Sequence, residues 1–161
     1  MKKIMLCLLA FSMVAATGCS KQTESGNPAQ SENSQVNSAA KEEAKKVDLP
    51  YGEDIGTGTM YIATPAGTSE DGNIPDLLVS NAMMIQIGLN AWGFDGSLLS
   101  YVYFDGEFYS KEQLSDTQTS ITLQGDMLKP GEHTISVVQY ANNEEGGEIV
   151  TYKEGKFNGI E

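Results

Sequence analysis

The stretch Tyr-Val-Tyr-Phe-Asp-Gly-Glu-Phe-Tyr at residues 101–109 decides the fold of this chain. Aromatic and β-branched residues, which are enriched in strands, stand on both sides of an Asp-Gly pair. Asp105 and Gly106 tolerate the positive φ angles that a two-residue type I′ turn requires. The stretch therefore predicts a β-hairpin, and strand-forming patterns continue on both sides of it.

Toward the N-terminus, residues 84–91 show the clearest alternation in the chain. Every second position from Ile85 to Ala91 is apolar, while Gln86 and Asn90 fall between them. A period of two places these apolar side chains on one face of a strand. The pattern predicts a half-buried strand with a polar second face.

Shorter strand signals fill the rest of residues 49–161. They lie at residues 60–63, 77–79, 120–123, 133–140 and 149–152, the last reaching toward Phe157. Turn residues separate them, and no segment carries a helical apolar stripe. About seven short strands at this spacing predict an all-β domain, a single antiparallel β-sandwich.

The run Leu-Lys-Pro-Gly-Glu-His-Thr-Ile-Ser-Val at residues 128–137 resembles the corner and sixth strand of bacterial immunoglobulin-like and fibronectin-type domains. The hairpin at 101–106 is similar to their third and fourth strands. The resemblance implies an immunoglobulin-like sandwich over residues 85–157. It implies adhesion, spacing, or protein or glycan binding, and it supplies no catalytic residues. The Cys-Trp-Cys pattern of antibody domains is absent from the sequence.

The N-terminus has the pattern of an export signal. Lys2 and Lys3 precede an apolar run at residues 4–16 that is too short for a permanent membrane span. The sequence Ala-Thr-Gly-Cys at residues 16–19 resembles the lipobox of bacterial lipoproteins, although Ala16 replaces the usual Leu. In that family the signal is cut between the positions of Gly18 and Cys19, and the cysteine carries lipid with acyl chains such as palmitate. An ordinary secretory signal with a chance cysteine is the alternative.

Residues 19–48 have the composition of a polar tether. The part from 20 to 46 contains one valine and no other large apolar residue. Such a segment cannot bury enough surface to offset its ordering entropy, so we expect it to be disordered. We expect residues 1–18 to be removed and the protein to sit on the outer face of the cell membrane, at a Gram-positive cell surface, through lipid on Cys19.

The charge balance excludes some partners. The chain has 10 Lys and Arg, all lysine, against 22 Asp and Glu, for a net charge of −12. Loss of Lys2 and Lys3 with the signal changes this to 8 − 22, or −14. Nucleic-acid binding needs clustered cations, so we expect no nucleic-acid partner. Cys7 leaves with the signal, so Cys19 has no thiol partner for a disulfide or a zinc cluster.

Catalytic equipment is sparse. His133 is the only histidine, and its place at the start of a strand after a turn favours a structural hydrogen bond. The acidic pairs, such as Glu53 with Asp54, lie in predicted turns and favour solvated faces over a glycosidase pair. We predict a non-enzymatic protein without cofactors other than the lipid.

Two groups of residues are candidates for a binding surface. The first is aromatic and would stack on sugar rings or a protein partner; it contains Trp92, Tyr101, Tyr103 and Tyr109. Tyr101 and Tyr103 share one face of the hairpin, so either that face is exposed or it is core. The second group is rich in oxygen and is a weak candidate for calcium, with no EF-hand spacing; it contains Glu70, Asp71, Asn73 and Asp76.

These observations predict a membrane-anchored, extracytoplasmic lipoprotein that presents a non-catalytic immunoglobulin-like domain to a protein or a cell-envelope polymer. The alternative is a small-ligand module that binds carbohydrate or calcium.

Overall fold

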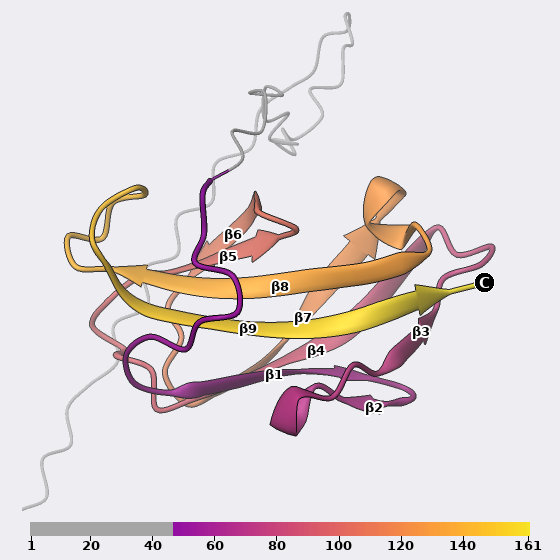
Figure 1. Ribbon diagram of the computed structural model, residues 1–161, viewed down its shortest axis with the longest axis horizontal. Coiled ribbons are helices and arrows are strands. Elements are labelled where there is room, and N and C mark those ends of the chain that lie inside the picture. The colour runs from indigo at the N-terminus through magenta and orange to yellow at the C-terminus, as the bar shows by residue number, and fades with distance from the viewer. Residues whose placement is uncertain (1–46) are drawn as a thin grey trace, which may run out of the picture. The chain divides into compact units, whose positions relative to one another are not determined.

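The structure is a computed structural model that describes residues 47–161 (Figure 1). The predicted signal peptide, Cys19 and nearly all of the predicted tether lie outside those residues. In the described part of the chain, no helix has the length and apolar character needed to cross a membrane.

Two β-sheets pack face to face. The first contains β2 (Gly67–Thr68), β1 (Thr59–Thr64), β4 (Met84–Trp92) and β7 (Thr117–Gln124), in that spatial order. The second contains β3 (Asp76–Leu78), β9 (Ile149–Ile160), β8 (Gly131–Tyr140), β5 (Ser100–Phe104) and β6 (Glu107–Glu112). Two single-turn 3₁₀ helices, η1 (Glu70–Gly72) and η2 (Gly125–Leu128), connect strands.

The strand order is that of an immunoglobulin-like sandwich. β1, β4 and β7 take the places of strands A, B and E, while β9, β8, β5 and β6 take those of G, F, C and C′. The predicted all-β sandwich is confirmed, with two differences. Residues 47–161 contain nine strands instead of about seven, and β3 runs parallel to β9. β2, which was not predicted, has two residues, too few for an alternating pattern to show, whereas β3 overlaps the strand predicted at residues 77–79.

The hairpin and the corner after η2 are joined by His133. Asp105 and Gly106 have φ angles of 48° and 84°, as a type I′ turn requires. The ring of His133 contacts the carbonyl oxygen of Lys129 through Nε2 (2.8 Å) and a carboxylate oxygen of Asp105 through Nδ1 (2.7 Å). The histidine therefore ties the corner at the start of β8 to the β5–β6 turn.

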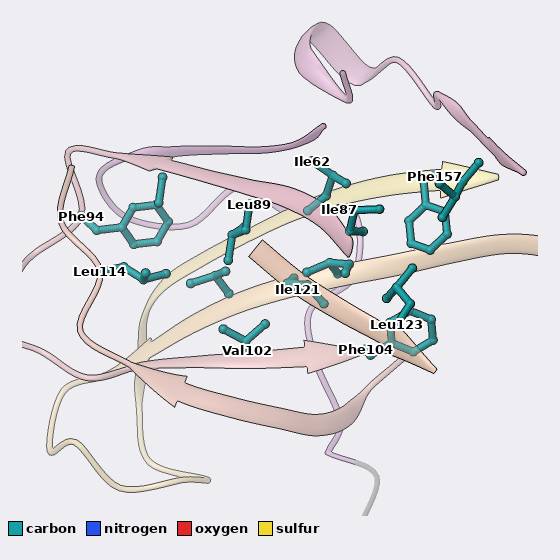
Figure 2. Close-up of a cluster of buried hydrophobic side chains, with 14 of the residues drawn as sticks. Ile62, Ile87, Leu89, Phe94, Val102, Phe104, Leu114, Ile121, Leu123 and Phe157 are labelled. Carbon is teal, nitrogen blue, oxygen red and sulfur yellow. The ribbon is translucent and has the colours of Figure 1, made fainter. Parts of the chain in front are cut away.

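The space between the sheets is filled by aliphatic side chains and phenylalanine (Figure 2). Leu89 of β4 and Ile135 of β8 are completely buried there. Val102 and Phe104 point into the same core from β5. Burial of each such side chain stabilises the fold by about 1.5–3 kcal/mol, so this layer accounts for most of the packing energy.

A second apolar layer lies on the outer face of the five-stranded sheet. Residues 47–55 cross this face in front of β8 and β9 before entering β1 (Figure 1). Leu49 packs there with Tyr101 and Tyr103, which are 4% and 0% exposed. Of the two alternatives for this face of the hairpin the structure has the core, so Tyr101 and Tyr103 are not the surface residues that the candidate aromatic platform required. The chain covers them with residues 47–55, where the sequence predicts no strand.

Candidate functional site

A groove of about 660 Å³ runs along the seam where β1 of one sheet meets β9 of the other. Its wall on one side is the segment that crosses the outer face, at residues 52–54. The opposite wall is η1, and Trp92 lies among the lining residues with β1. The floor includes Lys153 and Glu154 of β9. Residues far apart in sequence therefore build a single concave surface.

Lys153 fixes the first wall. Its side chain is only 7% exposed, and its ammonium group donates to a carboxylate oxygen of Asp54 and to the carbonyl oxygen of Gly56 (3.2 Å). Buried lysines are rare unless paired, and here the pair attaches the segment to β9. Ile55 strengthens the attachment through paired backbone hydrogen bonds with Tyr152 (3.0 and 3.1 Å).

Glu154 of β9 also holds the wall formed by residues 52–54. Its carboxylate accepts hydrogen bonds from the Tyr152 hydroxyl (2.6 Å) and the backbone amide of Gly52 (3.2 Å). Burial raises the pKa of Tyr152, and the hydrogen bond to Glu154 raises it further. Tyr152 therefore stays a neutral donor at physiological pH and holds Glu154 in place.

The second wall depends on Ser69. Its hydroxyl accepts from the backbone amide of Ile62 (2.8 Å), and its own amide donates to the carbonyl oxygen of Ile62 (2.8 Å). Gly155 makes this approach possible, because a Cβ atom there would lie 2.7 Å from the Ser69 hydroxyl oxygen. The bonds present the carboxylates of Glu70 and Asp71 at the rim of the groove.

Trp92 gives the groove an aromatic surface. It ends β4 opposite Thr59 and is 39% exposed. An indole left partly open to water beside carboxylates attracts cations through its ring face and apolar groups through its area. Tyr61 of β1 adds a second, half-buried ring to the lining.

The charge of the lining is strongly negative. Five carboxylates and one lysine line the groove, which gives 1 − 5, or −4, and Asp54 neutralises Lys153 directly. Among residues 47–161 no three His, Cys, Asp or Glu side chains converge closely enough to hold a metal ion. The carboxylates are spread along the groove, an arrangement that suits an extended positively charged ligand.

The aromatic candidates from the sequence separate in the structure. Trp92 lines the groove, whereas Tyr101 and Tyr103 are buried under residues 47–55. Tyr109 is half-buried at the edge of the sandwich, and its hydroxyl contacts β7. A shared aromatic surface of these four residues does not form, because β4, β5 and β6 present them to different faces.

The calcium candidates also separate. Glu70 and Asp71 line the groove, where Glu70 accepts a hydrogen bond from Thr68 (2.9 Å). Asn73 instead donates to the carbonyl oxygen of Thr68 (3.1 Å), and Asp76 accepts from Asn158 of β9 (2.9 Å). The four side chains therefore do not form one oxygen cage.

The sequence interpretation missed Glu53, Asp54, Lys153 and Glu154 as neighbours of Trp92. Two of them lie in a predicted turn and two in the last strand, so no spacing rule connects them. The one feature of the sequence that could have indicated the site is Lys153, a charged residue in the last strand. It follows Thr151 and Tyr152, and all three are buried. A lysine in such a strand indicates a nearby carboxylate.

Comparisons with known proteins find similarity among solved structures. No family model matches the chain, and no curated protein matches it. The fibronectin(III)-like modules of Clostridium thermocellum CbhA align with a TM-score of 0.33 and 13% sequence identity, over 55% of this chain and 90% of that module. We assign the immunoglobulin-like fold from the strand order, since an alignment at that score carries no weight of its own.

Proposed function

We propose that this protein is an extracytoplasmic lipoprotein whose immunoglobulin-like domain binds, without catalysis, a protein or cell-envelope polymer that carries positive charge. The groove between β1 and β9 is the binding surface. The observation that carries the proposal is the combination of net charge −4 with the partly exposed indole of Trp92 in one concave surface.

The chemistry of the groove favours cationic segments over small neutral ligands. Carboxylates spread along a groove attract several lysine, arginine or amino-sugar groups at once, and Trp92 adds a cation–π contact of about 0.5–1 kcal/mol at an exposed site. Complementary charge also accelerates the encounter between partners, an effect that salt reduces. We expect binding to weaken as ionic strength rises.

A lysine decapeptide serves as a cationic probe, and a chitin hexasaccharide serves as a neutral sugar probe. Calorimetric titration of the full-length chain in mild detergent is expected to show binding of the decapeptide that weakens from 50 to 300 mM salt. Trp92→Ala and the pair Glu70→Gln with Asp71→Asn should each reduce the affinity.

The matched control removes the same charge elsewhere. Glu107→Gln combined with Glu148→Gln changes two exposed acids that do not line the groove. If this control weakens decapeptide binding as much as the groove pair does, general acidity explains the binding and the groove proposal fails. Binding of the hexasaccharide alone, lost in Trp92→Ala, would favour the carbohydrate alternative.

The membrane anchor has a separate test. Cys19→Ala is expected to move the protein from the membrane fraction to the medium or to leave the signal uncleaved, and to abolish incorporation of labelled palmitate. Ser20→Ala is the adjacent control and should retain both properties. Labelled Cys19→Ala protein in the membrane fraction would refute the anchor while leaving the groove proposal intact.

A further inference from the structure

The four edges of the two sheets are protected to different degrees. A free edge exposes unpaired backbone amides and carbonyls that can pair with another strand, so proteins shorten such edges or place charges on them. β2 and β3 have only two and three residues, and β6 carries Glu107, Lys111 and Glu112. β7 is different: it has eight residues and contains no charge and no proline.

Tyr109 compensates for this weakness of β7. Its hydroxyl accepts a hydrogen bond from the backbone amide of Thr122 (2.9 Å) and lies 3.3 Å from the carbonyl oxygen of the same residue, to which it donates. One side chain of β6 thus occupies both backbone groups that Thr122 directs away from β4. The hydroxyl takes the position that a neighbouring strand would need.

An irregularity in β6 aims Tyr109 at this edge. Val102 pairs with Ser110 and Tyr103 pairs with Phe108, so Tyr109 is an extra residue with no partner in β5. Phe108 remains on the outer face against Tyr101 and Tyr103, whereas Tyr109 packs toward the inner core. Such β-bulges redirect side chains. Here the bulge sends a tyrosine from one sheet to the edge of the other.

We propose that β7 is a strand-addition edge that Tyr109 keeps closed, and that the strand it would otherwise accept is β7 of a second copy. Along a strand, backbone groups alternate in direction, so those of Gln118 and Ser120 face outward as those of Thr122 do. A two-fold antiparallel pair centred on Ser120 places Thr122 opposite Gln118 of the second copy.

The charge distribution supports a second copy as the occupant. The whole chain carries −12, so most surfaces of two copies repel each other. β7 has no charged residue along its length, and in a centred pair its apolar positions Ile121 and Leu123 stay on the inner face in both copies. Tyr109 blocks this pairing at Thr122, and the single-copy state is maintained.

The test compares Tyr109→Phe with the unmodified full-length chain in the same mild detergent. Loss of the hydroxyl is expected to increase amide exchange in peptides covering residues 117–124 on the order of fivefold, as loss of one hydrogen bond implies. Analytical ultracentrifugation is expected to show concentration-dependent dimers. Tyr51→Phe removes a hydroxyl from an exposed tyrosine and should behave like the unmodified chain.

A second variant ties the dimer to this edge. In Tyr109→Phe combined with Ser120→Lys, two lysines oppose each other across the centred pair, and the protein should return to the single-copy state. A folded Tyr109→Phe protein that stays in single copies at all concentrations would overturn the proposal. Dimers that persist in the double variant would overturn it as well, since another surface would then hold them.

Discussion

The two faces of the five-stranded sheet use the same strands and reach burial by different means. On the inner face Val102, Ile135 and Phe157 meet the other sheet in a core built of aliphatic side chains and phenylalanine. On the outer face Tyr103 and Tyr152 meet a single crossing segment, at residues 47–55. The inner layer lies between two sheets, whereas the outer layer is covered by one crossing segment of the chain.

This difference explains why tyrosine predominates in the outer layer. A tyrosine buries a large ring while its hydroxyl reaches a polar partner near solvent. The hydroxyl of Tyr103 contacts the hydroxyl of Tyr140 and donates to the carboxylate of Glu145 (3.0 Å each). The hydroxyl of Tyr101 donates to the carbonyl oxygen of Asn143 (2.7 Å). The buried hydroxyls therefore keep hydrogen-bond partners under a cover that is a single segment of chain.

The largest expected effect comes from the inner layer. Ile135→Ala removes a completely buried side chain between two packed sheets, where little can move to fill the space. We expect the free energy of unfolding, measured by urea denaturation, to fall by about 2–5 kcal/mol. Ile135→Val, which keeps most of the volume, should cost about 0.5–1.5 kcal/mol. Equal losses in the two variants would argue against a tightly packed inner core.

A smaller effect is expected from the cover of the outer layer. Leu49→Ala truncates a side chain that is 5% exposed and belongs to the short crossing segment, which can close over the gap better than a sheet can. The same urea titration should show a loss of about 2 kcal/mol, the lower end for such a change. Tyr51→Ala, two residues on and 46% exposed, is the matched control. If it costs as much as Leu49→Ala, burial of Leu49 is not what holds the segment down.

Alkaline pH should distinguish the layers, because the buried tyrosines all belong to the outer one. Burial, aided by the hydrogen bond with Tyr140 for Tyr103 and with Glu154 for Tyr152, raises both tyrosine pKa values. An unfolded tyrosine ionises near pH 10, so the unfolded chain loses these protons first. Stability is therefore complete below about pH 10 and falls above it, by about 1.4 kcal/mol per pH unit for each tyrosine.

Tyr152→Phe should make that alkaline slope shallower by the contribution of one tyrosine. Urea titrations between pH 9 and pH 11.5 measure it, and Ile135→Val on the inner face should keep the slope of the unmodified chain. A Tyr152→Phe slope identical to that of the unmodified chain would contradict the assignment of the alkaline loss to the outer layer.

The smallest effect concerns the rim of the outer layer. The ammonium group of Lys111 lies 5.2 Å from the centre of the Tyr101 ring. Lys111→Ala should lower the free energy of unfolding by about 0.5 kcal/mol, as for an exposed cation–π pair. Lys129→Ala provides the control, since its exposed pair with Asp126 touches no aromatic ring. The contact would be confirmed if Lys111→Ala costs more stability than Lys129→Ala, and if this difference disappears when Tyr101 is replaced by leucine.

The fold was largely predictable because its signals are local. The Asp-Gly turn, the alternation from Ile85 to Ala91 and the corner before His133 each predict an element from adjacent residues, and the structure places all three as expected. The candidate site was not predictable in the same way. Trp92 was identified as a candidate, but its neighbours Asp54 and Lys153 are 99 positions apart in the chain.

By itself, then, the sequence determined the class of fold, the hairpin and the acidic character of the domain, because turn chemistry and a period of two act within a few residues. Only the tertiary structure decided which face of Tyr101 and Tyr103 would be covered, where carboxylates would meet Trp92, and that Tyr109 would reach Thr122. Each of these depends on which distant strands pack together, and that packing cannot be predicted from patterns within a few adjacent residues.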